Sequence, residues 1–279
     1  MTILSGKARV AGITGWPVSH SRSPRLHGFW LGRHGIDGAY VPLPIEPAHF
    51  PAAIRGLMFS GFAGVNVTIP HKVTAFAICD TVDDSARRAG AVNTLVFESG
   101  RITGSNTDGW GFLENLRANG VDPAGGPALI LGAGGSARAI AAALLGLGIK
   151  VAVAGRTRAR ADDLARELPG LSVIAWEDRD HALPDHALLV NTTPLGMAGQ
   201  APLEIDLDRA ARGLTVADIV YVPLETPLLA DARARQIRCV EGLGMLLYQA
   251  VPGFRAWFGV DPMVDEALRR FVASDLPRA

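Results

Sequence analysis

The sequence has few cysteines, and this scarcity excludes two classes of protein. Cys79 and Cys239 are the only cysteines among 279 residues, and no metal-ligand spacing connects them. A disulfide framework and a cysteine-based metal site are therefore not expected. We interpret both residues as reduced core cysteines of a cytoplasmic protein.

The sequence also lacks an excess of charge and any long apolar run. Lysine and arginine together number 27 and are balanced by 27 aspartate and glutamate residues, and no basic run occurs. Nucleic acid and anionic membranes are therefore not expected as partners. The N-terminus shows no basic region followed by an apolar block, so no signal peptide is predicted, and no stretch is long enough to span a bilayer. The length suggests about two domains.

A short apolar run followed by a glycine-rich loop is the most informative feature of the chain. Ala128–Leu131 is typical of a buried strand, and a helix-forming run begins after the loop. Strand, tight turn and helix start together form the fingerprint that holds a dinucleotide pyrophosphate. A glycine-rich turn without a ligand is the alternative, but the flanking strand and helix favour a nucleotide site. The candidate loop residues are Gly132, Ala133, Gly134, Gly135, Ser136 and Ala137.

The residues after the next strand indicate which dinucleotide is bound. Val151–Ala154 is predicted as that strand, and no acidic residue follows it to hold the ribose hydroxyls of NAD. Arg156, Thr157 and Arg160 stand there instead and are suited to a ribose phosphate, so we predict NADP as cofactor. The alternative is a solvent-exposed basic helix start, which the helix dipole disfavours.

Strands and helices alternate along the chain, which predicts an α/β fold with two domains: a mostly parallel α/β domain and a doubly wound, Rossmann-type nucleotide domain, with a cleft between. The Pro- and Gly-rich segment 122–127 is the clearest linker, and the second sheet is expected to begin at Ala128. Strands are expected at 9–15, 39–43, 64–69, 93–97, 101–104, 128–131, 151–154, 171–175, 188–191, 216–220 and 239–241. The tail is expected to be helical at 245–258 and 261–273, and it could return to the first domain.

Four polar residues in the first half could serve chemistry. Ser21 and Ser23 could hold a carboxylate, although Ser23 is also a plausible N-cap with Pro24 at the first helical position. Lys72 follows a strand end, where ligands of open α/β sheets gather. A lysine and Asp108 could together stabilise and protonate the alkoxide left by hydride transfer to a ketone. The alternatives are a solvated lysine and a helix-capping aspartate.

Eight motifs, taken together and in this order, resemble those of the shikimate dehydrogenase family across nearly the whole chain. They are GWPVSHSRSP at 15–24, NVTIPHK at 66–72, AVNT at 91–94, NTDG at 106–109, GAGGSA at 132–137, NTTPLGM at 191–197, DIVY at 218–221 and GLGMLLYQ at 242–249. The resemblance implies NADPH-dependent reduction of 3-dehydroshikimate to shikimate in the chorismate and aromatic amino acid pathway. It also implies a first domain made of residues 1–107 and 245–279 and a second domain made of residues 108–244. We also consider a homodimer.

The resemblance also implies roles for individual residues. Lys72 and Asp108 would form the catalytic pair. The expected substrate-binding residues are Ser21, Ser23, Thr68, Asn93, Tyr221 and Gln249. Ile219 and Gly242 would join the glycine loop and the Arg156 segment in binding NADP, and no metal is expected.

One departure from the family pattern bears on the cofactor. Gly155 replaces the asparagine of the family's Asn-Arg-Thr segment. The arginine and threonine of that segment remain as Arg156 and Thr157, so NADP is still expected, with a changed adenine contact. Two alternatives stay open: a quinate or quinate/shikimate dehydrogenase relative with relaxed substrate or NAD use, and a non-catalytic NADP-binding regulator of the same fold. The presence of both Lys72 and Asp108 argues against the regulator.

Overall fold

A computed structural model describes residues 3–276, and the chain divides into two compact units. The first comprises residues 3–107 and 249–274, and the second comprises 108–248 with 275–276. The second junction lies between Tyr248 and Gln249, at the end of α10 (Gly242–Gln249), and the sequence interpretation placed it after residue 244 of the same helix. Residues 1–2 and 277–279 of the expected domains lie outside the described residues.

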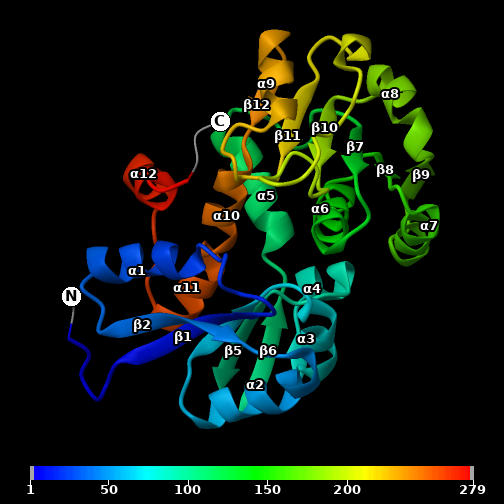
Figure 1. The fold of residues 1–279 in the computed structure, drawn as a ribbon. Helices are drawn as coiled ribbons and strands as arrows, with labels where there is room; N and C mark the ends of the chain where they lie inside the picture. The colour runs from blue at the N-terminus through cyan, green and yellow to red at the C-terminus, as the bar shows by residue number, and fades with distance from the viewer. Residues whose placement is uncertain (1–2, 277–279) are drawn as a thin grey trace. The chain divides into compact units, whose positions relative to one another are not determined.

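The first unit is built on a six-stranded sheet with the order β2-β1-β3-β5-β6-β4. Figure 1 labels β1, β2, β5 and β6 of this sheet. Its strands are β1 (Arg9–Gly15), β2 (Gly38–Pro44), β3 (Gly64–Val67), β4 (Thr81–Val82), β5 (Thr94–Glu98) and β6 (Arg101–Ser105). The pairings β1–β2, β1–β3 and β4–β6 are parallel, whereas β5 is antiparallel to both β3 and β6. The sheet is therefore mostly parallel, as predicted, with β5 alone reversed. The tight turn at Ser99 and Gly100, both at positive φ, connects β5 to β6.

Alternating side chains of β3 divide the core of the first unit into two layers. Val65 and Val67 face an apolar cluster with Phe50 and Ile54 of α2 (Phe50–Phe59). Asn66 points to the other face, where Tyr40 of β2 donates a hydrogen bond to it. The remaining helices of residues 3–107 are α1 (Ser23–Arg33), α3 (Lys72–Ile78) and α4 (Asp84–Ala89), with the short turn η1 (Pro47–His49).

The C-terminal helices α11 (Val251–Phe258) and α12 (Glu266–Ala273) belong to the first unit. The indole nitrogen of Trp257 donates a hydrogen bond of 3.0 Å to the carbonyl of Leu95 in β5. The indole nitrogen of Trp30 in α1 donates a hydrogen bond of 3.0 Å to the carbonyl of Met263. The guanidinium group of Arg22 donates a hydrogen bond of 2.7 Å to the carbonyl of Val272. These contacts join segments that lie more than 150 residues apart in sequence.

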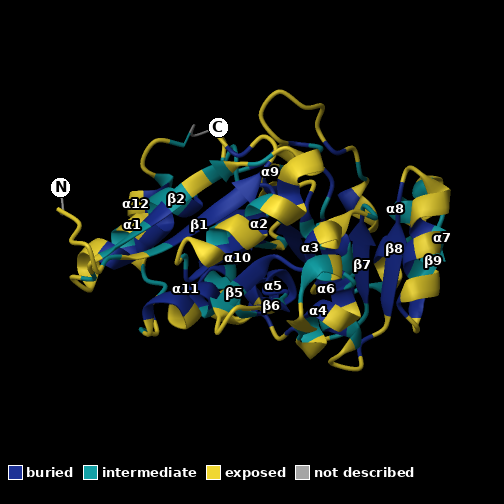
Figure 2. Ribbon diagram, turned by 90° about the horizontal axis from the view of Figure 1, so that it is seen from below, coloured by how far each residue is buried: buried dark blue, intermediate teal, exposed yellow. Residues whose placement is uncertain are grey.

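The second unit holds a six-stranded parallel sheet with the order β12-β11-β10-β7-β8-β9. Its strands are β7 (Ala128–Leu131), β8 (Val151–Ala154), β9 (Leu171–Ile174), β10 (Leu188–Asn191), β11 (Thr215–Asp218) and β12 (Arg238–Val240). Numbered within this unit, the order is 3-2-1-4-5-6, that of the Rossmann fold. The predicted nucleotide domain is therefore confirmed. Figure 2 shows β7 and β8 as buried strands, which fits their unbroken apolar sequences.

Helices cover both faces of this second sheet. Leu116 and Ile140 pack with Ile130 on one face, on α5 (Asp108–Ala118) and α6 (Gly135–Leu145). Leu229 of α9 (Pro227–Ala234) packs with Leu129 on the other face. The remaining helical segments of this unit are α7 (Arg158–Glu167), η2 (Trp176–Asp178), α8 (Arg179–Ala182), η3 (Leu183–Asp185) and η4 (Leu207–Arg209).

The structure corrects several sequence expectations. Segment 122–127 lies inside the second unit and does not link the two units. The reason is that α5, which precedes this segment, packs closely on α6 of the second unit. A Cβ on Gly109 of α5 would lie 2.7 Å from the carbonyl oxygen of Ala139 in α6. Ser23 is not an N-cap; it is the first residue of α1, Arg22 precedes it, and no side chain caps the helix. The final helix starts at Glu266, capped by Asp265, and not at residue 261. Both cysteines are free, as expected, but only half-buried.

Candidate active site

One edge of the first sheet collects Lys72 and four of the six residues expected to bind substrate, whereas Tyr221 belongs to the second unit and Gln249 ends α10. The carboxyl ends of the parallel strands β1, β3 and β6 meet there, and so does the amino end of β5, because β5 runs the other way. Ser21 and Ser23 follow β1, Thr68 and Lys72 follow β3, and Asn93 precedes β5. The backbone amide of Trp16 donates to the carbonyl of Ile69 at 3.0 Å, which joins the segments after β1 and β3.

Asn93 is a buried side chain with several hydrogen-bond partners. It is 2% exposed, and its Oδ1 accepts hydrogen bonds from the Thr107 amide at 2.9 Å and the Thr94 hydroxyl at 3.0 Å. Its Nδ2 donates to the Thr107 hydroxyl at 3.0 Å, and that hydroxyl donates to the backbone carbonyl of Gln249 at 2.7 Å. The structure therefore brings Asn93 and Gln249 to the same hydroxyl group.

Ser23 is 3% exposed and has two polar neighbours. Its amide donates to the Oγ of Ser21 at 3.2 Å, so the two serines are held together. Its side chain lies beside Tyr40 and opposes the burial that raises the pKa of the Tyr40 phenol well above its usual value. The chain thus places the predicted serine pair against a buried phenol.

Lys72 begins α3 and is fixed by its backbone. Its carbonyl accepts the amide of Val92 at 2.9 Å, next to Asn93. The preceding His71 is 1% exposed, stacks on Phe50 with ring centroids 4.4 Å apart, and makes a 2.8 Å hydrogen bond to the carbonyl of Ile45. Burial lowers the pKa of His71. The start of α3 is therefore anchored on both sides of the lysine.

Asp108 is the first residue of α5 and is 6% exposed. It follows Thr107 directly in the chain, but it belongs to the second unit, whereas Lys72 belongs to the first.

The glycine loop has the form that the fingerprint requires. Gly132 has φ +105°, and its amide donates to the carbonyl of Ala154 at 2.8 Å. Added Cβ atoms on Gly134 and Gly135 would meet nothing within 4 Å, which leaves space above the start of α6. Ala137 is fully buried, as close helix–strand packing demands. The exposed amides of this helix start are suited to a phosphate group.

The segment after β8 presents basic side chains beside this loop, since β7 and β8 are paired with Leu131 opposite Ala154. Arg156, Thr157 and Arg160 are all exposed. Within residues 3–276 the guanidinium groups of Arg156 and Arg160 form no ion pair, whereas that of Arg158 bonds Asp162 at 2.8 Å. A Cβ on Gly155 would lie 3.4 Å from that of Ala133, which is ordinary contact.

Ile219 and Gly242 lie together at the end of β11. A Cβ on Gly242 would fall 2.5 Å from the carbonyl oxygen of Ile219, so only glycine fits there. Tyr221, two residues after Ile219, is half-buried. The structure thus places Ile219 and Gly242 in contact within the second unit.

Sequence reasoning assigned no role to the buried polar groups that support these loops. Asp218 and Asn191 end the adjacent strands β11 and β10, and a 3.0 Å hydrogen bond joins their side chains. Tyr40 and Asn66 form a similar pair in the first unit. A polar residue ending or interrupting an apolar strand run was the available signal, as at Asn66, Asn191 and Asp218.

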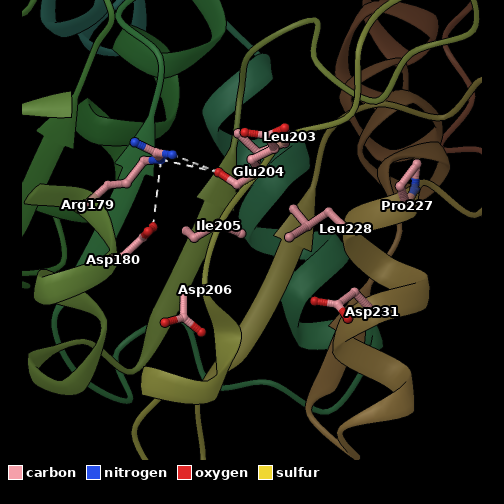
Figure 3. A pocket seen from close by; sticks show the side chains of 9 residues that line it. All are labelled: Arg179, Asp180, Leu203, Glu204, Ile205, Asp206, Pro227, Leu228 and Asp231. Carbon is pink, nitrogen blue, oxygen red and sulfur yellow. Dashed lines mark hydrogen bonds and ion pairs between the residues drawn. The ribbon is translucent and has the colours of Figure 1, made fainter. Parts of the chain in front are cut away.

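A pocket of about 540 Å³ in the second unit lies elsewhere, lined by residues 203–206 and by residues of α8 and α9 (Figure 3). Arg179 lies at its border and donates to the carbonyl of Glu204 at 2.9 Å. None of the residues predicted to bind substrate or cofactor lines this pocket. It is therefore separate from the candidate site.

Within residues 3–276, no cluster of three or more histidine, cysteine or acidic side chains is arranged to hold a metal ion. None of the helices in that range has the length and apolar character needed to cross a membrane.

Family models match most of the chain. Residues 13–95 match the shikimate dehydrogenase substrate binding domain, residues 119–194 match shikimate / quinate 5-dehydrogenase, and residues 242–269 match the shikimate 5'-dehydrogenase C-terminal domain. A protein of Acidiphilium cryptum (strain JF-5) named shikimate dehydrogenase (NADP(+)) is 68% identical over 274 residues, which is 98% of this chain and 99% of that protein.

Solved structures agree with these matches. A Thermus thermophilus shikimate 5-dehydrogenase in complex with NADP(H) and shikimate is 38% identical, with a TM-score of 0.85 over 94% of this chain and 99% of that one. A Corynebacterium glutamicum quinate dehydrogenase in complex with NAD is 28% identical, with a TM-score of 0.89 over 96% and 99% of the two chains. With the glycine loop, the strand order and these matches agreeing, the chain belongs to the shikimate dehydrogenase family.

Proposed function

We propose that the chain is an NADP-dependent shikimate dehydrogenase that interconverts 3-dehydroshikimate and shikimate in aromatic amino acid biosynthesis. The observation that carries the proposal is the edge of the first sheet, where Ser21, Ser23, Thr68, Lys72 and Asn93 come from three strands to one place. The names of relatives that match nearly the whole chain support the same reaction.

The residues of the second unit fit NADP. The open space above Gly134 and Gly135 accommodates a pyrophosphate against the amides of α6. Arg156 and Arg160 provide guanidinium groups for the ribose phosphate, and Thr157 lies between them in sequence. Ile219 and Gly242 would form the opposite wall of the NADP site. NADPH, when bound, supplies a hydride to the ketone carbon of the substrate.

Lys72 and Asp108 are the proposed catalytic pair. Reduction of a ketone leaves an alkoxide, which needs a positive charge beside it and then a proton. The Nζ ammonium of Lys72 provides both: it stabilises the oxygen and donates a proton from Nζ. The carboxylate of Asp108 is the proposed group of opposite charge that holds the lysine ammonium in place. In the reverse direction, the neutral amine accepts the proton of the substrate hydroxyl.

The serine pair is the proposed site for the substrate carboxylate. Two hydroxyls held side by side can each donate a hydrogen bond to one carboxylate. Thr68, Asn93 and Gln249 are proposed to contact the ring hydroxyls, and Tyr221 to contact the substrate or close its pocket. Asn93 is held rigidly by Thr94 and Thr107, which fixes the direction of its amide.

A second candidate function is the NAD-linked oxidation of quinate. Gly155 favours it, because the family's asparagine contact is missing there. The similarity to a quinate dehydrogenase in complex with NAD and to a Listeria monocytogenes shikimate 5-dehydrogenase in complex with shikimate and NAD makes this substrate and cofactor worth testing.

Steady-state oxidation assays with the four combinations of shikimate or quinate and NADP or NAD test both candidates. We expect shikimate with NADP to give the highest kcat/KM. A preference for quinate with NAD would replace the first proposal by the second. Binding of NADP without turnover of either substrate would leave the non-catalytic regulator as the function.

We also propose a cytoplasmic location and a homodimer. The two free cysteines suit a reducing compartment. β2 is at the edge of its sheet, and its outer side pairs with no strand in the described residues, which offers a surface to a second copy. Sedimentation velocity measures the mass and tests the dimer.

A further inference from the structure

A buried carboxylate at the end of β11 has no part in the proposed reaction. Asp218 is 1% exposed and accepts three hydrogen bonds. Asn191 Nδ2 and the Val220 amide donate to Oδ1, each at 3.0 Å, and the Thr226 hydroxyl donates to Oδ2 at 2.7 Å. Each donor belongs to a different segment, so one side chain connects three parts of the second unit.

The carboxylate is one of the groups that orient the amide of Asn191. All three neighbours donate to the carboxyl group, so Asp218 acts as an acceptor towards each of them. Burial raises the pKa of Asp218 to about 6, and these three hydrogen bonds oppose that shift. Asn191 directs its Nδ2 at Asp218 and also at the carbonyl of Leu195, 3.2 Å away. Its Oδ1 is left to accept from Thr193, from the amide at 3.0 Å and from the hydroxyl at 2.7 Å.

The loop that Asn191 holds in this way supports the glycine loop. The hydroxyl of Thr192 donates to the carbonyl of Leu131 at 2.7 Å, and its amide donates to the same oxygen at 2.9 Å. Leu131 ends β7, directly before Gly132. A Cβ on Gly132 would lie 2.7 Å from the Oγ1 of Thr192, so the two loops are in close contact.

The other two hydrogen bonds fix the opposite wall of the site. Val220 follows Ile219, whose carbonyl oxygen lies 2.5 Å from the position that a Cβ on Gly242 would take. Thr226 caps α9 by accepting the amide of Leu229. Loss of the carboxylate would release both segments together with the Asn191 loop.

We propose that Asp218 is a positioning residue for NADP: without touching the cofactor, it sets the glycine loop through Asn191 and Thr192 and the Ile219 wall through Val220. The inference rests on the proposed use of NADP. Asp218 would thus affect the affinity for NADP although it lies beneath the residues that would contact NADP.

The test measures NADP affinity by calorimetry with the whole chain and without shikimate. We expect Asp218→Ala to weaken NADP binding about tenfold or more, the loss of a hydrogen bond to a charged group. Asp218→Asn retains an acceptor at Oδ1, so it should stay within about threefold of the parent. Thr215→Val is the matched control, because Thr215 is buried at the other end of β11, where its amide donates to the carbonyl of Ala187.

Amide hydrogen exchange provides a second readout that does not depend on the cofactor. Protection of the Thr193 and Val220 amides should fall in Asp218→Ala and persist in Thr215→Val. If Asp218→Ala does not fold, Asn191→Ala replaces it, and the same loss of NADP affinity is expected.

The outcomes separate this inference from the proposed function. A parent chain that binds no NADP contradicts the proposed function. A parent that binds NADP, with Asp218→Ala or Asn191→Ala binding it equally well, overturns the positioning role. The role is also overturned if Asp218→Asn is as weak as Asp218→Ala, or if Thr215→Val loses as much affinity.

Discussion

The phenol of Tyr40 donates a hydrogen bond of 2.6 Å to the Oδ1 of Asn66, across the strand that separates β2 from β3. Asn66 Nδ2 in turn donates to the carbonyl of Asn93 at 3.2 Å and to the hydroxyl of Thr94 at 3.1 Å. Because Ser23 lies beside Tyr40, a row of buried polar groups extends from the serine pair to Asn93. The substrate-binding edge of the first sheet is therefore supported by polar groups beneath it.

We predict that Tyr40→Phe destabilises the fold by about 1–3 kcal/mol, because the buried Asn66 oxygen loses its donor. The KM for shikimate should rise, since Ser23 loses its partner. Chemical denaturation and steady-state kinetics measure the two effects. A double-mutant cycle with Asn66→Ala is the control, and strictly additive losses would show that the two side chains are not coupled.

Replacing Ser21 and Ser23 together by alanine should chiefly weaken shikimate binding. Two hydrogen bonds to a carboxylate are lost, which corresponds to roughly a hundredfold or more in affinity. The KM for NADP should not change. Kinetics with each substrate varied in turn provide the measurement, with Ser60→Ala as an exposed control in the same unit. An unchanged shikimate KM in the double variant places the carboxylate elsewhere.

Lys72→Ala should lower kcat on the order of a hundredfold or more, because the alkoxide loses its positive neighbour and its proton donor. The fold should be retained, since His71 and Val92 anchor this segment through other atoms. Turnover and circular dichroism are measured side by side, with Lys7→Ala as a control that removes the same charge from an exposed position. Near-normal turnover in Lys72→Ala would exclude it as the catalytic cation.

Arg156→Ala should reduce NADP affinity roughly ten- to a hundredfold and leave NAD affinity nearly unchanged, because a charge-assisted contact to phosphate is lost. Arg166→Ala, which removes an exposed guanidinium at the other end of α7, is the control. Titrations of the parent and of both variants with NADP and with NAD give the ratio of the two affinities. Equal loss for NADP and NAD would show that Arg156 does not read the phosphate.

The buried histidine His27 should make the fold sensitive to acid. It stacks on Tyr40 with ring centroids 3.9 Å apart, and burial lowers its pKa from 6.5 to about 3, with Asn66 opposing the shift. Between pH 6.5 and about pH 3, the unfolded chain therefore carries a proton on this histidine that the folded chain does not. The free energy of unfolding consequently falls as the pH drops through this range.

The size of this acid effect can be measured with His27→Phe. Relative to that variant, the parent should lose on the order of 3 kcal/mol between about pH 7 and about pH 4. Urea unfolding at a series of pH values gives the difference, and His34→Gln, at an exposed position, is the control. Parallel pH curves for the parent and His27→Phe would contradict the prediction.

Much of the fold follows from local patterns in the sequence. Arg9–Gly15, Val151–Ala154 and Leu188–Asn191 are strands with the expected bounds, because each is an apolar run that ends at polar or glycine residues. The glycine loop was found in the same way. Its fingerprint combines a positive φ at Gly132 with a buried Ala137, and both requirements are visible in residue type.

Other features depend on contacts that no local pattern contains. Serine is a residue type that often caps helices, but Ser23 is the first residue of α1, and its side chain lies beside Tyr40. The linker composition of segment 122–127 was misleading because the packing of Gly109 on Ala139 decides where the second unit begins. The short pair β4 and α4 was not foreseen, and Asp218 was seen only as part of a motif.

The return of α11 to the first unit has a consequence for how the chain folds as it is synthesised. The indole of Trp257 covers Gly64 and bonds the carbonyl of Leu95, so the sheet made first lacks part of its core until translation has passed α11. The second unit, by contrast, is nearly continuous in sequence and can form as soon as residue 248 has left the ribosome. The N-terminal half is thus translated first and completed last, and a nascent chain stalled before α11 would expose the apolar face that Trp257 covers.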